Sequence, residues 1–407
     1  DRAYLSSSTN ADGKSRDAVT EGLVIATAST VKTGSNIVLS KDADDTIAGI
    51  DLSAGTTGDS KIDNSKGNDF GMRLKGGDGK NTILGGAKND YISGGSKSDV
   101  LNGDDGADFI EGGTGGKDSI VAGTGNDTIT VKSGMTLSDT ISGGVGTDSL
   151  SFADDNKTTT DLDSVTLVEQ VYVDNTKTDS AITLKDATVA ASSSLALDAT
   201  KLTTGKLTFD ASAETDGTVS VVGGGANDTI TGGALADIIT GGAGNDSLKG
   251  NAGADSFTYT STTSGSDSIV DFATATDKFR MLGDFLTGSM GGSAADAANA
   301  IAYGGGIDLD AAGTGNDTVQ VIASGALTAV AGDLTTIADL NAAIGTISNV
   351  TADDERVLAF SAGDGAFALY YYNEGATATA ALAADELTLL ASGTTSADLV
   401  VGDFTFV

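Results

Sequence analysis

The 407-residue sequence contains no cysteine, histidine, proline or tryptophan. Without cysteine the chain has no disulfide framework and no thiolate metal site. Without histidine it has neither a zincin metalloprotease motif nor a Ser-His-Asp triad. Proline averages about 5% of residues, and its absence removes slow cis–trans isomerisation from folding. We expect such a chain to suit export in an unfolded state, followed by folding outside the cell.

Positive charge and long hydrophobic runs are also scarce. The chain has 23 Lys and Arg against 57 Asp and Glu, a net charge of −34. This excess excludes nucleic-acid binding through phosphate contacts and disfavours an anionic membrane surface as a partner. No hydrophobic run reaches membrane-spanning length, so no membrane insertion is expected. The first twenty residues lack a signal peptide and begin without Met, so we expect a processed product or a fragment.

Glycine and aspartate are abundant, and from Gly223 to Thr258 they follow a nine-residue pattern. The pattern is G-G-x-G-x-D-x-U-x, in which U is a large apolar residue. Its sixth position holds Asp228, Asp237, Asp246 and Asp255. Its eighth position holds Ile230, Ile239, Leu248 and Phe257.

A first array with the same pattern runs from Gly76 to Ser151. Asn81 replaces the carboxylate in its opening unit and is expected to weaken that site. Lys88 and Lys97 stand at the fourth position, where glycine belongs, and are tolerable beside a cation only if they point to solvent. The sixth position of the following units holds Asp90, Asp99, Asp108, Asp118, Asp127 and Asp148.

The nine-residue spacing predicts a turn of six residues and a strand of three, with two units in each coil. Turns on one side then recur about every eighteen residues, so Asp228 is expected over Asp246 and Asp237 over Asp255. We expect the glycines to serve positive φ angles and close packing. The stacked turns direct carboxylate and carbonyl oxygens into a shared gap, which suits Ca²⁺ better than Mg²⁺. The predicted calcium ligands are Asp90, Asp99, Asp108, Asp118, Asp127, Asp148, Asp228, Asp237, Asp246 and Asp255.

Both arrays resemble the RTX family of secreted bacterial proteins. The resemblance implies a β-roll that forms outside the cell on calcium binding, and a type I secretion system that reads an uncleaved C-terminal signal. The layout from Gly76 to Phe279, with a β-rich spacer between the arrays, is similar to Caulobacter-type surface-layer proteins. That similarity implies a structural subunit that crystallises with calcium on the cell surface.

The expected fold is all-β, a parallel β-roll or β-helix with a β-rich spacer and a mainly β C-terminal domain. Alternation in the spacer is consistent with a β-helix or a sandwich. In the C-terminal part, residues 334–347 have helical spacing, and residues 357–360 and 367–370 indicate a hairpin. The predicted domains are an irregular β region (1–75), the first array (76–151), the spacer (152–222), the second array (223–258) and a capping or secretion domain (259–407).

The sequence therefore predicts an extracellular, calcium-dependent structural protein, not an enzyme, whose partner is further copies of itself in a surface layer or filament. One alternative is a secreted adhesin that binds cell-surface polysaccharide through Tyr370, Tyr371 and Tyr372, although alternate packing of these tyrosines in a strand also explains them. The other is the non-catalytic part of a type I secreted enzyme. Carboxylate-only chemistry of the glycosidase kind stays open, but metal ligation accounts for the same aspartates.

Overall fold

The computed structural model divides the chain into two compact units, Asp1–Lys201 and Leu202–Val407. Nearly all regular structure in the described residues is β, apart from one 3₁₀ turn, η1 (Leu162–Ser164). No helix among them is long and apolar enough to cross a membrane. The structure describes residues 2–3, 23–26, 36–38, 47–53, 58–65, 71–131, 139–152, 160–174, 179–261, 263–274, 276–282, 299–301, 307–308, 319–322, 347–348, 355–361, 366–373, 387–395, 399 and 403–406.

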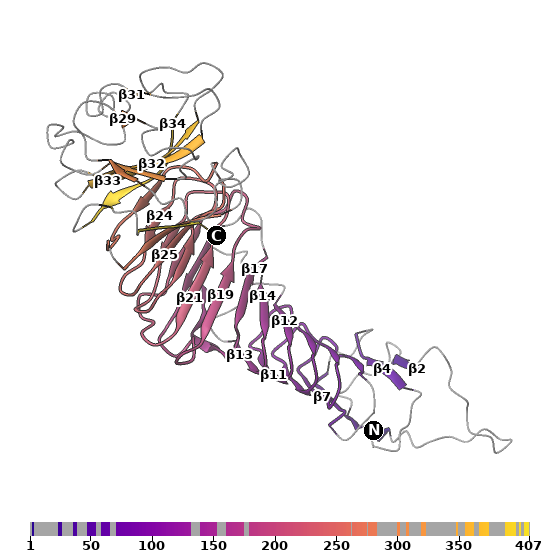
Figure 1. Ribbon diagram of the computed structural model, residues 1–407. Coiled ribbons are helices and arrows are strands. Elements are labelled where there is room, and N and C mark those ends of the chain that lie inside the picture. The colour runs from indigo at the N-terminus through magenta and orange to yellow at the C-terminus, as the bar shows by residue number, and fades with distance from the viewer. Residues whose placement is uncertain are drawn as a thin grey trace. The chain divides into compact units, whose positions relative to one another are not determined.

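In the first unit, consecutive strands alternate between two parallel sheets, so that two strands and two turns make one coil of a β-solenoid (Figure 1). One sheet contains β1 (Arg2–Ala3), β3 (Asn36–Val38), β5 (Ser60–Asp63), β7 (Asn81–Gly86), β9 (Val100–Asp105), β11 (Ser119–Thr124), β13 (Thr140–Val145) and β16 (Val165–Thr166). The other contains β2 (Leu23–Ala26), β4 (Ile47–Asp51), β6 (Arg73–Lys75), β8 (Tyr91–Gly95), β10 (Phe109–Gly113), β12 (Thr128–Val131), β14 (Ser149–Phe152), β17 (Gln170–Val173) and β19 (Ser194–Asp198). Strands β15 (Thr160–Asp161) and β18 (Ser180–Thr183) form a further parallel pair.

The core of this unit consists of the eighth-position side chains, which pair directly from coil to coil. On one side Leu101 pairs with Ile83 and Ile120, and all three are at most 1% exposed. On the other side Ile110 pairs with Ile92 and Ile129, each fully buried. Because no single unit can bury its own apolar residue, stacking is what closes the core. The predicted parallel β-roll is confirmed.

The spacer continues this architecture within the first unit. Val171 in β17 pairs with Leu150 in β14 and with Leu197 in β19, again in parallel register. These residues are at most 1% exposed. Of the two alternatives for this part of the spacer, the β-helix is therefore correct.

One unit of the first array carries an extra residue, and the structure shows where it goes. The pairing of β10 with β12 shifts between Glu111 and Gly113, and the exposed residues that follow include Gly115 and Gly116 with φ of 79° and 102°. Ile120 nevertheless keeps its register with the coils on either side. The extra length leaves the coil as an outward bulge, so the core ladder is not interrupted.

The second unit repeats the two-sided coil, and the strands of its array have the predicted three residues except the last, which has four. The strands of the first array, with four to six residues, are longer than predicted. One side contains β20 (Leu207–Asp210), β22 (Thr229–Thr231), β24 (Ser247–Lys249) and β26 (Asp267–Ile269). The other contains β21 (Thr218–Val222), β23 (Ile238–Thr240), β25 (Ser256–Tyr259) and β27 (Lys278–Met281). Every pairing among these strands in the described residues is parallel.

Antiparallel strands and aromatic rings close the far end of this solenoid. The predicted hairpin is confirmed, because β32 (Glu355–Ser361) pairs antiparallel with β33 (Ala366–Asn373), which in turn pairs antiparallel with β34 (Leu387–Thr394). Strand β34 joins β26, and β35 (Phe404–Phe406) joins β27, both in parallel. The ring of Phe279 lies 4.5, 5.7 and 5.4 Å from those of Phe272, Phe367 and Phe404.

The remaining strands of the C-terminal part are short. Of the segment predicted as a helix, residues 334–346 lie outside the described residues, and Ile347 lies in a strand. These strands are β28 (Asn299–Ile301), β29 (Ile307–Asp308), β30 (Val319–Ile322) and β31 (Ile347–Ser348).

Candidate calcium sites

The predicted aspartates all lie at the end of a turn, directly before a strand. None is more than 5% exposed, although each carries a carboxyl group. They are Asp90, Asp99, Asp108, Asp118, Asp127 and Asp148 in the first unit and Asp228, Asp237, Asp246 and Asp255 in the second.

One oxygen of each carboxylate connects neighbouring coils. The Oδ1 atom of Asp108 accepts a hydrogen bond from the backbone N–H of Asp90, one coil earlier, at 2.7 Å. The same bond runs from the N–H of Asp228 to Asp246 Oδ1 at 2.7 Å and from the N–H of Asp237 to Asp255 Oδ1 at 2.9 Å. The predicted stacking of these aspartates is therefore confirmed.

The second oxygen, Oδ2, is buried without any hydrogen-bond partner in seven of the ten aspartates. Burial of an ionised oxygen without a partner is strongly unfavourable, so such groups in native proteins are normally paired or bound to a metal. An oxygen ligand for a cation is thus present in turn after turn. The seven are Asp90, Asp99, Asp108, Asp127, Asp148, Asp246 and Asp255.

The other three predicted ligands differ in their surroundings. The Oδ2 atoms of Asp228 and Asp237 accept backbone N–H groups of Gly224 and Gly233 at 2.7 and 2.6 Å. Asp118 belongs to the unit with the extra residue, and its Oδ2 lies 3.4 Å from the Cβ position of the unit's first glycine, against 2.1 Å for Asp108. The seven carboxylates whose Oδ2 atom has no hydrogen-bond partner therefore give the firmer ligand set.

In most units the first position is a glycine that is required by space and not by its φ angle, whereas the Asp127 unit opens with the buried Ala122. A Cβ at Gly103 would lie 2.1 Å from Asp108 Oδ2 and 2.3 Å from the carbonyl oxygen of Ala122 in the next coil. Positive φ occurs instead at the second and fourth positions, for example 106° at Gly242 and 115° at Gly244. The expectation that all these glycines serve positive φ is corrected for the first position. There the missing side chain leaves a cradle lined by carboxylate and carbonyl oxygens, which are the ligands that Ca²⁺ prefers.

Burial and neighbouring carboxylates raise the pKa of these groups, so the ionised form is disfavoured. Desolvation, with a smaller contribution from the Asp90 and Asp127 charges, raises the pKa of Asp108 to about 7. Desolvation likewise raises the pKa of Asp246 to about 7 and that of Asp90 to about 6. A bound cation removes this penalty because an opposite charge favours the ionised form. The side chains of Lys88 and Lys97 are exposed, so neither occupies the turn interior.

The carboxylate ladder continues beyond the residues that the nonapeptide pattern identifies. The N–H of Asp118 bonds to Asp139 Oδ1 at 2.8 Å, and the N–H of Asp148 to Glu169 Oε2 at 2.7 Å. In the second unit Asp267 and Asp277 accept in the same way from the coil before, at 3.0 and 3.1 Å. These turns lack the full glycine signature, of which the Asp267 turn keeps Gly265, but each acidic residue stands two places before a buried apolar one. That spacing is the signal that could have identified them.

A second ladder, which the sequence did not reveal, lies at the fifth position of the units. Exposed asparagines accept the backbone N–H of the next coil, as Asn89 does from Ala107 at 2.9 Å and Asn245 from Ser266 at 2.9 Å. The Asn-Asp pairs at positions five and six therefore have separate tasks. The asparagine ties coils together at the surface, and the aspartate does so inside.

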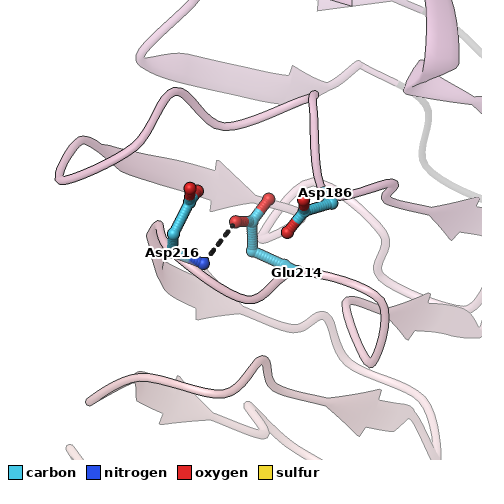
Figure 2. Close-up of side chains that lie close together, drawn as sticks. All are labelled: Asp186, Glu214 and Asp216. Carbon is cyan, nitrogen blue, oxygen red and sulfur yellow. Dashed lines mark hydrogen bonds between the residues drawn. The ribbon is translucent and has the colours of Figure 1, made fainter.

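Glu214 presents a similar buried oxygen outside the repeats. It is fully buried, and its Oε1 accepts the N–H of Asp216 at 3.2 Å (Figure 2) and that of Gly217 at 2.9 Å. Its Oε2 has no hydrogen-bond partner. It lies before the second array, in a turn without the nonapeptide pattern.

Comparison with known proteins identifies the repeats. The family model of the RTX calcium-binding nonapeptide repeat matches residues 75–110, 112–131 and 222–257. Among curated proteins no sequence matches this chain. Among solved structures, the extracellular lipase LipA from Serratia marcescens is similar at 20% identity over 55% of this chain, with a TM-score of 0.15. The matched part spans 35% of the lipase, and a likeness at this score gives no information on activity.

The matched repeats bind several Ca²⁺ ions, in agreement with the predicted cofactor. RTX repeats occur in proteins that are secreted from the cell, so they indicate a secreted calcium-binding protein. The unpartnered carboxylate oxygens and the glycine cradles fit that ion on independent, structural grounds.

Proposed function

We propose that the protein is an extracellular structural subunit whose arrays fold on calcium binding and which then assembles into a surface layer or filament. The observation that carries the proposal is the stack of buried Oδ2 atoms without partners in both units. An ion-free solenoid retains these like charges in its interior. The calcium-loaded solenoid is neutralised along its length and becomes a rigid element.

The strength of this control follows from typical affinities. Extracellular calcium modules bind with Kd of about 10⁻⁴ to 10⁻³ M. A ligand at a hundred times its Kd stabilises the folded state by about 2.7 kcal/mol per site. A few occupied sites therefore match the typical net stability of about 5–15 kcal/mol. In a low-calcium cytosol the chain stays open for export, by a type I system in this proposal, and it folds outside.

Three features favour a structural role over the alternatives. The outward faces of β9, β11 and β13 carry exposed apolar side chains, Val100, Val121 and Val145 at 48, 44 and 71% exposure, which can contribute to contacts between copies. The tyrosines suggested for sugar stacking are largely unavailable, because Tyr370 and Tyr372 are at most 2% exposed and Tyr371 is half-buried. The absence of histidine removes the usual general base and acid.

The test is negative-stain electron microscopy with light scattering, on purified protein in EGTA, in Mg²⁺ and in Ca²⁺. Sheets or filaments that form only with Ca²⁺ support the proposal. Dispersed monomers with calcium-folded arrays would contradict assembly and favour an adhesin or the non-catalytic part of a secreted enzyme. Circular dichroism on the same samples separates folding from assembly.

A further inference from the structure

Asn81 occupies the sixth position in the opening unit of the first array, where each following unit has an aspartate. It is 2% exposed, and Ile83 two places later is fully buried, so the unit is packed like the others. Its side-chain Nδ2 atom has four oxygens within hydrogen-bond distance. These are the carbonyl oxygens of Gly77 at 3.1 Å, Gly79 at 2.8 Å and Gly94 at 3.0 Å, and Asp99 Oδ1 at 3.0 Å.

Four oxygens are more than an amide group can serve, since –NH₂ has only two N–H donors. Such an oxygen-rich environment is typical of a cation site and not of an amide chosen for its own hydrogen bonds. The orientation of the amide follows from the same contacts. The reversed orientation would place Oδ1 against four oxygens and lose the bond that Oδ1 accepts from the N–H of Gly77 at 3.2 Å.

The next unit shows the same place occupied by an oxygen. A Cβ at Gly76 would lie 2.6 Å from Asn81 Nδ2, and a Cβ at Gly85 would lie 2.6 Å from Asp90 Oδ2. The nitrogen in the first case is saturated with acceptors, whereas the oxygen in the second has no partner. The two turns therefore have the same shape but differ in the group that fills it. In the first turn the side chain places N–H donors among the oxygens, and in the second it adds a carboxylate oxygen without a partner.

We infer that the Asn81 side-chain amide takes the place of a calcium ion, so that the opening turn of the first array closes without metal. The inference rests on calcium binding by the other repeats and is independent of whether subunits assemble. The ion-free turn also engages Asp99, one coil later, through both the backbone N–H and the amide of Asn81, at 2.7 and 3.0 Å. It thus provides a formed turn between the preceding coil of β5 and the calcium-binding coil of β9, on which the calcium-binding coils can stack.

The direct test is to restore the carboxylate with Asn81→Asp and to count bound ions by native mass spectrometry during a calcium titration of the full chain. We expect one calcium ion more than in the unsubstituted protein. The matched control is Asn245→Asp, which adds the same charge at an exposed fifth position and is expected to leave the count unchanged. An unchanged count for Asn81→Asp in folded protein would overturn the inference.

The reverse substitution tests the same idea from the other side. The Asp90→Asn variant is expected to bind one calcium ion fewer than the unsubstituted protein. In EGTA its residues 85–93 are expected to be better protected from hydrogen exchange than the same residues of the unsubstituted protein. A loss of the ion without any gain of protection in EGTA would show that an amide cannot replace the metal, and the inference would fail. If Asn81→Asp does not fold in calcium, Asp90→Asn decides the question alone.

Discussion

Removal of calcium should make the stability of the arrays depend on pH in the opposite sense to that of the calcium-loaded protein. Desolvation raises the pKa of Asp246 and Asp255 from 3.8 to about 7 in the folded state. The folded state then binds more protons than the unfolded state between these values, so stability falls as pH rises. The destabilisation is absent below about pH 4 and complete above about pH 7.

The magnitude can be set from the size of the shift. One pKa unit corresponds to about 1.4 kcal/mol, and solvent beside the turn screens part of the charge, so we take about 2 kcal/mol for each carboxyl group. Asp246 and Asp255 together then cost the ion-free second array about 4 kcal/mol at neutral pH, a large share of a net stability of about 5–15 kcal/mol. Protonation of these carboxyl groups at low pH is therefore expected to restore part of the stability that calcium provides at neutral pH.

The assay is circular dichroism with urea unfolding, at about pH 5 and about pH 8, in EGTA and in Ca²⁺. In EGTA the β signal and the urea midpoint should be higher at about pH 5. In Ca²⁺ the order should reverse, because protons compete with the ion for the same oxygens. About 1 M NaCl screens exposed charges but not buried ones, so it should not reproduce the effect of acid. A recovery in salt equal to that in acid, or no pH dependence in EGTA, would refute the reasoning.

Three further predictions concern the second array. Gly241→Ala places a Cβ 2.2 Å from Asp246 Oδ2, so we expect one calcium ion fewer by native mass spectrometry and a lower Tm in calcium, while exposed Ala243→Ser should change neither. Ile239→Ala should lower the free energy of unfolding, measured in urea, by about 2–5 kcal/mol, because Ile239 is fully buried. Its neighbour Ile238 is 38% exposed, so Ile238→Ala should change that free energy by no more than about 0.5 kcal/mol, and equal losses would contradict the assigned strand faces. Mg²⁺ should fail to restore the β signal after EGTA, since it requires near-ideal octahedral geometry, and equal recovery in circular dichroism would argue against these irregular cradles.

The sequence was sufficient to predict the coil and its core, because both follow from one spacing. The apolar residue two places after each aspartate fixes which side chain enters the core, as in Ile110 and Leu248, and glycine marks the turns. The spacer was ambiguous because strands of a β-helix and of a sandwich share the same alternation. Only the parallel register of Val171 with its neighbours distinguishes them.

The division of labour within each carboxylate could not be predicted. The pattern shows that Asp108 faces a turn, but not that Oδ1 is engaged by the backbone of the previous coil while Oδ2 stays without a partner. The role of Asn81 was hidden for the same reason, since a substitution at a ligand position reads as a weaker site until its contacts are known. The later acidic residues were missed for a related reason: the turn before Glu169 lacks glycine, and the turn before Asp267 keeps only Gly265.

The outward bulge after Gly113 has a practical consequence for engineering. Residues 114–117 are exposed, and the strand that follows them, β11, keeps its register with the coils on either side although this unit is already longer than its neighbours. A peptide tag or a small binding module inserted between Gly115 and Gly116 would therefore project from the solenoid without displacing the stacked side chains of its core. If copies of the chain do form an ordered array, that loop offers a regularly repeated display point.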